Sequence, residues 1–109
     1  MSNELDILKN VKKLFVDIKE LIYNNPEYKY TLNQQLVKSI VSVGSNLVEG
    51  QRRGNKEFLR FLDIAIGSAA EVKFQLELYA IDNDISYLLD LSDKIIGQLI
   101  NFKKYRSTL

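Results

Sequence analysis

The fold of this chain is decided by residues 39–71, which read SIVSVGSNLVEGQRRGNKEFLRFLDIAIGSAAE. This stretch has the pattern of a helix that ends in a short basic turn, followed by the start of a longer helix. Gly50 and Gly54 bracket the turn, and Asn55 is placed to cap the helix that follows. Polar side chains recur before the turn at helical spacing, so they share one helix face: Ser39, Ser42, Asn46 and Glu49.

Both helices of this pair carry apolar side chains at spacings of three and four. We expect the first over residues 32–51, with Thr31 as its N-cap, and the second from residue 56 to residue 80 or 81. On the first helix, one stripe consists of Leu36, Ile40, Val43 and Leu47, and an adjacent one of Val37, Val41, Gly44 and Val48. On the second, the main stripe consists of Phe58, Phe61, Leu62, Ala65, Ala69, Val72, Leu76 and Tyr79.

A further amphipathic helix precedes this pair, over residues 4–23. Either Ser2 or Asn3 can cap its start, and the Asn-Asn-Pro sequence of residues 24–26 ends it, because proline disfavours helical geometry in the residue before it. Its inward stripe is predicted to be Leu8, Val11, Phe15, Ile18 and Ile22, flanked by Leu14 and Leu21.

The chain closes with a fourth helix, expected over residues 86–104. The side chains that we expect to face inward there are Leu88, Leu91 or Ser92, Ile95, Leu99 and Phe102. Tyr28 and Tyr30, in the linker after the first helix, are expected to fold back onto the others. The patterns together predict an all-α fold: an up-down-up-down antiparallel four-helix bundle that forms a single domain, residues 1–109.

The polar stripe before the turn has two interpretations. Glu49 and Glu71 each follow a polar residue by three positions, which is the spacing that di-iron bundles use for metal ligands. Those bundles require histidine, and this chain has none, so a metal centre is not favoured. The preferred interpretation is an interhelical polar network that fixes the register of the helices, formed by Ser42, Asn46, Glu49, Ser68 and Glu71.

Composition limits the remaining chemistry. The chain contains no Cys and no His, so nucleophilic catalysis of the Cys–His or Ser–His type has no partners. We expect no catalytic residues, no metal and no cofactor, and hence no enzyme. The first residues show no signal-peptide pattern, and no apolar run approaches the roughly 20 residues that cross a bilayer. A soluble, cytoplasmic protein is the expectation.

The third helix has more apolar surface than one bundle core requires. A second stripe, on another side of that helix, contains Ile64, Gly67, Phe74 and Leu78. An exposed apolar stripe of this kind indicates a subunit interface. The alternative is that a loop, or the linker with Tyr28 and Tyr30, covers it.

Basic residues are concentrated in two places, although the net charge is only +1. The turn and the start of the third helix contain Arg52, Arg53, Lys56 and Arg60, and the end of the last helix contains Lys103, Lys104 and Arg106. Such segments are candidates for phosphate contacts, whereas isolated basic residues are usually ordinary solvated charges.

Two segments of the chain resemble a known family. They are residues 45–53, SNLVEGQRR, and residues 56–72, KEFLRFLDIAIGSAAEV. They resemble the four-helix-bundle proteins encoded in 23S ribosomal RNA intervening sequences, and the resemblance covers nearly the whole chain. That family is similar in fold to the accessory protein of diversity-generating retroelements, a pentameric bundle with a basic, nucleic-acid-binding surface. The resemblance therefore implies a homo-oligomeric ring, a pentamer, and carries over no catalytic residue.

Two functions remain open from the sequence. The first is a non-catalytic oligomer that binds RNA or DNA through Arg52, Arg53, Lys56 and Arg60, with Lys103 and Lys104 as a second patch. The second is a protein-interaction scaffold that makes no contact with nucleic acid.

Overall fold

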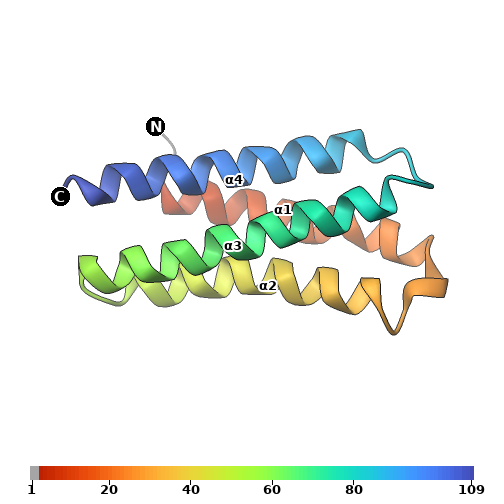
Figure 1. Ribbon diagram of the computed structural model, residues 1–109, viewed down its shortest axis with the longest axis horizontal. Coiled ribbons are helices and arrows are strands. Elements are labelled where there is room, and N and C mark those ends of the chain that lie inside the picture. Colours follow the sequence, from red (N-terminus) through yellow and green to blue (C-terminus); the bar gives the residue numbers. More distant parts are fainter. Residues whose placement is uncertain (1–2) are drawn as a thin grey trace.

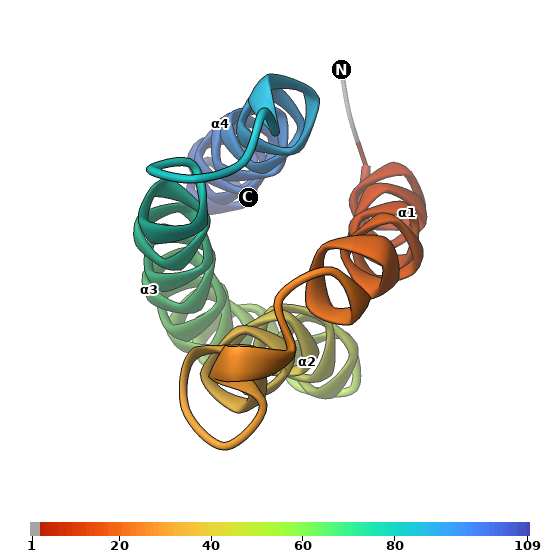
Figure 2. The ribbon, with the colours of Figure 1, turned by 90° about the vertical axis from the view of Figure 1, so that its right-hand side faces the viewer.

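The protein consists of helices joined by short connections, as the computed structural model shows for residues 3–109 (Figure 1). The α-helices are α1 (Glu4–Tyr23), α2 (Leu32–Gln51), α3 (Asn55–Tyr79) and α4 (Ser86–Ser107), and a short 3-10 helix, η1 (Pro26–Tyr28), follows α1. No strand occurs in residues 3–109, so the all-α prediction with four helices is confirmed. Successive helices run in opposite directions along the long axis, and Figure 2 shows them arranged around a common centre.

The helices pack through one continuous apolar core. The first apolar stripe of α2 and the predicted stripes of α3 and α4 are almost entirely buried, whereas the adjacent stripe of α2 is not, since Val41 and Val48 are 50% and 46% exposed. The fully inaccessible residues include Leu36, Leu47, Leu62, Ala65, Leu88 and Leu99. On α1 the predicted stripe is only partly correct. Val11 and Ile18 are buried, but Phe15 is 36% exposed and Leu8 and Ile22 are only half-buried. The buried residues of α1 are Ile7, Val11, Leu14, Ile18 and Leu21.

The helix ends lie close to their predicted positions, although α4 runs to Ser107 instead of Lys104, and two of the three predicted caps do not form. Asn3 caps α1 by accepting a hydrogen bond from the Asp6 backbone amide at 3.0 Å, while Ser2 lies outside the described residues. Thr31 is at the N-cap position of α2, yet its hydroxyl donates to the Tyr28 carbonyl instead of capping the helix. The predicted cap Asn55 is wrong, because α3 already begins at Asn55 and Gly54 precedes it as the N-cap.

The linker before α2 folds back only in part. Tyr28 packs edge-on against Tyr79, with the ring centroids 5.8 Å apart, whereas Tyr30 is 76% exposed. At the other end of α2, Gly50 permits the tight turn into α3. A Cβ atom at this position would lie 2.8 Å from the Phe58 ring and 2.9 Å from the Phe61 Cβ, so only glycine fits without a shift.

Candidate nucleic-acid interface

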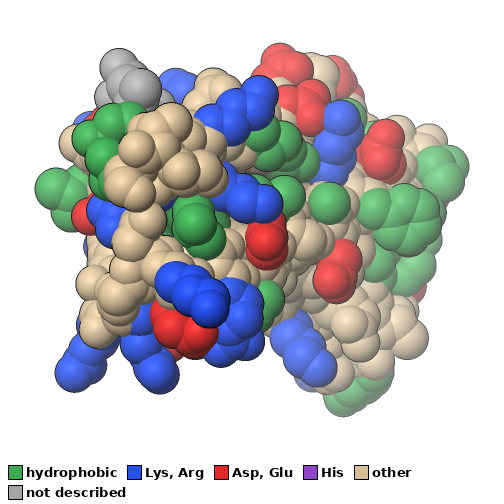
Figure 3. Space-filling model, turned by 60° about the vertical axis from the view of Figure 1, so that its left-hand side comes forward, with side chains coloured by type: hydrophobic (Ala, Val, Ile, Leu, Met, Phe, Trp, Pro, Cys, Tyr) green, Lys and Arg blue, Asp and Glu red, His purple; other side chains and the backbone are tan. Residues whose placement is uncertain are grey.

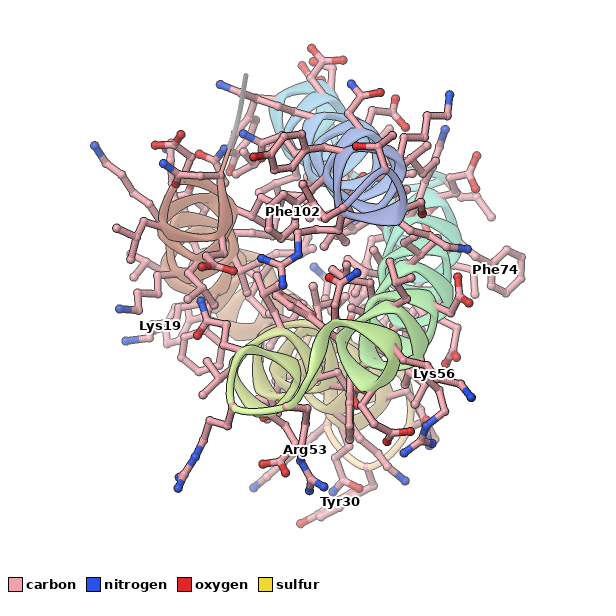
Figure 4. All side chains as sticks on the ribbon, turned by 90° about the vertical axis from the view of Figure 1, so that its left-hand side faces the viewer. Lys19, Tyr30, Arg53, Lys56, Phe74 and Phe102 are labelled. Atoms are coloured by element: carbon pink, nitrogen blue, oxygen red, sulfur yellow. The ribbon has the colours of Figure 1, made fainter. Side chains whose placement is uncertain are left out.

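The two basic segments that the sequence places far apart lie at the same end of the bundle. The α2–α3 turn and the end of α4 are both at the left of Figure 1, and Figure 4 looks onto that end. Asn55 connects them directly. Its Nδ2 donates to the Arg106 carbonyl oxygen at 3.1 Å, and its Oδ1 accepts from Arg106 Nε at 2.9 Å. The side chain that was expected to cap α3 thus joins α3 to the last turn of α4.

The near-zero net charge conceals a strong asymmetry along the bundle. When each helix is divided at its midpoint, the half with the α2–α3 turn comprises residues 3–13, 42–67 and 97–109. This half contains ten Lys or Arg and five Asp or Glu, a formal charge of +5. The opposite half, residues 14–41 and 68–96, contains five and nine, a formal charge of −4. Figure 3 shows Lys and Arg side chains over the basic end, with a few acidic side chains among them.

Three of the predicted phosphate-binding residues are already engaged by carboxylates. Arg53 pairs with Glu49, Arg60 with Glu57 at 3.2 Å, and Lys103 with Asp63 at 2.5 Å. The hydrogen bond from Arg53 lowers the pKa of the Glu49 carboxyl and raises that of the Arg53 guanidinium. All of these pairs are solvent-exposed, so a phosphate competes with them at modest cost.

The other three predicted residues are not ion-paired. Within residues 3–109, Arg52, Lys56 and Lys104 form no salt bridge, and each is exposed. Of the six candidates, these three can contact a ligand without first losing an internal ion pair. The sequence does not distinguish the six candidate residues, whereas the structure divides them into three that are ion-paired and three that are not.

Aromatic rings support the arginines of this end, which the sequence analysis did not anticipate. Arg53 and Arg60 both lie over the Phe61 ring, with centroid distances of 5.6 and 4.9 Å. Arg106 lies 4.6 Å from the centroid of Phe58. Such cation–π contacts orient the guanidinium groups. The helical spacing placed Phe61 in the apolar stripe of α3, but it did not predict that Arg53 and Arg60 would lie over its ring.

The predicted interhelical polar network is assembled only in part. Ser42 of α2 and Ser68 of α3 share a hydrogen bond of 2.7 Å, and Asn46 donates to both the carbonyl and the hydroxyl of Ser42. Glu49 bonds Arg53 near the end of its own helix instead of crossing to α3. Glu71 is exposed and makes no hydrogen bond or ion pair within residues 3–109. Both glutamates therefore lie outside the contact between the helices.

A second polar network, which the sequence analysis missed, lies at the opposite end of the bundle. The buried Tyr79 hydroxyl donates to Asn33 Oδ1, and Asn33 Nδ2 donates to the Asn25 carbonyl at 3.0 Å. Asn25 in turn donates to the Leu21 carbonyl at 2.7 Å, and Asn83 to the Tyr79 carbonyl at 2.8 Å. Burial raises the pKa of Tyr79 to about 12, so its hydroxyl remains a donor even at pH values at which an exposed tyrosine ionises.

The second apolar stripe of α3 is open to solvent. Ile64, Phe74 and Leu78 are 41%, 59% and 38% exposed, and Gly67 is exposed as well. The linker that contains Tyr30 does not cover them. In Figure 4, Phe74 points outward from α3, away from the other helices.

The interior offers little room for other chemistry. The cavity at the middle of the bundle has a volume of about 10 Å³ and is lined by Val11, Leu14, Ile40, Val43, Ala69, Val72, Ser92 and Ile95. Within the described residues, no three His, Cys, Asp or Glu side chains are grouped so that they could hold a metal ion.

A comparison with known families decides the identity. The model of the 23S rRNA-intervening sequence protein family matches residues 3–102, which is all but the first two and last seven residues. The chain belongs to this family. The two segments that resemble this family, residues 45–53 and 56–72, both lie inside the match. Neither the curated proteins nor the solved structures that were compared with it gave a match.

The match to the intervening sequence family ends within α4. Residues 103–109, which contain Lys103, Lys104 and Arg106, lie beyond it, whereas the whole α2–α3 turn lies inside it. The described helices of the intervening sequence protein include none that is long and apolar enough to cross a membrane.

Proposed function

We propose that this intervening sequence protein is a non-catalytic homo-oligomer that binds RNA or DNA through the basic end of its bundle. The observation that carries the proposal is the meeting of the α2–α3 turn with the end of α4, which gives one half of the molecule a formal charge of +5. Phosphate groups are the ligands that such a surface favours, and helix α3 directs its N-terminal amides toward the same end.

Self-assembly is the second part of the proposal. Its support is the exposed apolar stripe of Ile64, Gly67, Phe74 and Leu78, together with the ring that the family resemblance implies. In a cyclic ring whose axis is parallel to the bundles, symmetry places all basic ends on one face. Several weak phosphate contacts then act on one polyanion together, which raises avidity without any new contact.

A pair of charge-reversal variants tests the nucleic-acid proposal. Lys56→Glu/Lys104→Glu removes two unpaired cations from the basic end. Lys19→Glu/Lys94→Glu, in the acidic half, changes the net charge by the same amount and serves as the control. Binding of a structured RNA is titrated by fluorescence anisotropy at low and at physiological salt.

We expect the first variant to bind about tenfold or more weakly at low salt, with a log–log salt slope smaller by about 0.9 for each lost phosphate contact. The control should bind nearly as the wild type does. If both variants lose affinity equally, net charge and not the basic end controls binding. If the wild type does not bind even at low salt, the proposal fails, and the exposed stripe on α3 favours a protein-interaction scaffold.

A further inference from the structure

The outer face of α3 forms an apolar ridge, which we define as Ile64, Gly67, Phe74, Leu78 and Ile81. The first four of these residues are three, seven and four positions apart, so they share one helix face, and Ile81 lies in the turn two residues beyond the end of the helix. Phe74 and Ile81 are the most exposed, at 59% and 76%. Two exposed carboxylates, Glu71 and Glu77, accompany the ridge. Within residues 3–109, no other segment covers the ridge.

A groove lies on a different side of the molecule, between α1 and α2. We call it the α1–α2 seam. Its first hollow, of about 600 Å³, has Phe15 and Val16 on one wall and Val41 and Val48 on the other. Val16, Val41 and Val48 are 58%, 50% and 46% exposed. Gly44 also lines this hollow, and a Cβ atom there would make only an ordinary contact with Val11, at 3.6 Å.

The seam continues toward the acidic end as a second hollow of about 380 Å³. Ile22 and Val37 supply its apolar lining, and Lys29 and Lys38 lie at its rim. This second hollow is thus bordered by cations, whereas the ridge is bordered by carboxylates.

Hydrogen bonds between α2 and α3 show which parts of the ridge and the seam lie at the same height along the bundle. Ser68 bonds Ser42, and Gln75 bonds Ser39 at 3.1 Å. Ile64 and Gly67 are therefore level with the first hollow, around Val41 to Val48. By the same reasoning, Phe74 and Leu78 are level with the second hollow, around Val37 and Lys38.

These positions favour contact between copies related by rotation about an axis parallel to the bundle, since such a rotation leaves heights unchanged. Phe74 and Leu78 of one copy then meet Ile22 and Val37 of the next, and Glu71 and Glu77 face Lys29 and Lys38. The charges select the orientation more than they add affinity, because they are exposed. A two-fold contact of ridge with ridge leaves the seam uncovered, and a contact of seam with seam leaves the ridge uncovered. Only a head-to-tail contact covers both in every copy.

We infer that the α3 ridge of one copy docks head to tail into the α1–α2 seam of a second copy. This inference rests on the homo-oligomer of the proposed function and specifies the two surfaces that meet. Figure 4 shows that Phe74 points away from the side on which α1 and α2 meet, so the two surfaces of one molecule cannot close on each other.

The test uses one defect on each surface. Phe74→Lys damages the ridge and Val41→Glu damages the seam. Phe74 is 59% exposed and Val41 is 50% exposed, so each variant should still fold. Circular dichroism checks this, and Val48→Glu replaces Val41→Glu if helix content falls. Tyr87→Lys, at an exposed aromatic residue of α4 outside both surfaces, is the matched control. Masses are measured by sedimentation equilibrium.

We expect Phe74→Lys and the seam variant each to be monomers of 12.6 kDa, and the control to assemble as the wild type does. An equimolar mixture of the two defective variants should form a heterodimer and nothing larger, because it contains one intact ridge facing one intact seam. If the mixture stays monomeric, or if the seam variant assembles normally, the head-to-tail contact is refuted while the homo-oligomer stands. If the wild type is itself a monomer, the homo-oligomer and the contact both fail.

Discussion

Tyr79→Phe removes a single hydroxyl group from the acidic end of the bundle and tests the buried network there. Tyr79 is 1% exposed, and its hydroxyl donates to Asn33, which is 5% exposed. Without this donor, Asn33 Oδ1 remains buried and loses its partner, although its amide nitrogen still bonds the Asn25 carbonyl. Leaving one buried acceptor unsatisfied costs about 1–3 kcal/mol. For a domain of this size, this corresponds to a fall in melting temperature of roughly 4–12 °C.

The same hydroxyl predicts a pH dependence whose sign is fixed by its raised pKa. Above pH 10 the unfolded chain releases the Tyr79 proton, but the folded chain holds it until about pH 12. The unfolded state then binds fewer protons, so the stability of the wild type falls as the pH rises from 10 to 12. The full effect of two pH units is at most about 2–3 kcal/mol. Tyr79→Phe lacks this term, so the difference between the two proteins should shrink over the same interval.

Urea denaturation followed by circular dichroism, at one protein concentration and at pH 7, 10, 11 and 12, measures both effects. Tyr30→Phe, at a residue that is 76% exposed, is the control and should change the stability by less than about 0.5 kcal/mol. The reasoning is refuted if Tyr79→Phe is as stable as the wild type at pH 7 and the two stability profiles run parallel up to pH 12.

Three further substitutions test the core, the turn and the outer face. Val43→Asp puts an unpaired charge at a position that is 3% exposed, so chemical denaturation should show that the free energy of unfolding falls by several kcal/mol. An unchanged free energy would mean that Val43 is not in the core. Gly50→Ala forces a Cβ atom against Phe58 and Phe61, so a thermal melt should show that the free energy of unfolding falls by about 1–3 kcal/mol. An unchanged melting temperature would disprove the close approach of Phe58 and Phe61 to the Gly50 backbone. If the proposed homo-oligomer forms, Leu78→Lys, at a position that is 38% exposed, should lower its mass while helix content stays the same. An unchanged mass in sedimentation would contradict this role of Leu78.

The helices could be predicted from the sequence because their apolar spacing is sustained over many turns. The bounds expected for α1 and α2, residues 4–23 and 32–51, are those observed. Phe15 was misplaced because adjacent stripes on α1 fit the spacing almost equally well, and only packing against the other helices selects the face that begins at Ile7. Asn55 was misjudged because its partner Arg106 is 51 residues away in the sequence.

The candidate site was predictable only at the level of segments. Antiparallel neighbours bring the α2–α3 turn and the end of α4 to one end of a bundle, so their meeting follows from topology. Which of the cations pair with carboxylates depends on rotamers and on contacts such as that of Lys103 with Asp63, 40 residues apart. The network of Tyr79 and Asn33 was missed because these residues are 46 positions apart and neither has a distinctive local pattern.

The dimensions of the bundle set the size of anything that its basic end can cover. The molecule measures 45 by 24 by 18 Å, so a ligand that approaches along the long axis meets an area of only 24 by 18 Å. This is shorter than the roughly 34 Å of one turn of duplex DNA, so a single copy cannot contact two successive turns. If nucleic acid binds there, one protomer would protect only a few nucleotides from a nuclease. The length of a longer protected segment would then indicate how many copies lie side by side on it.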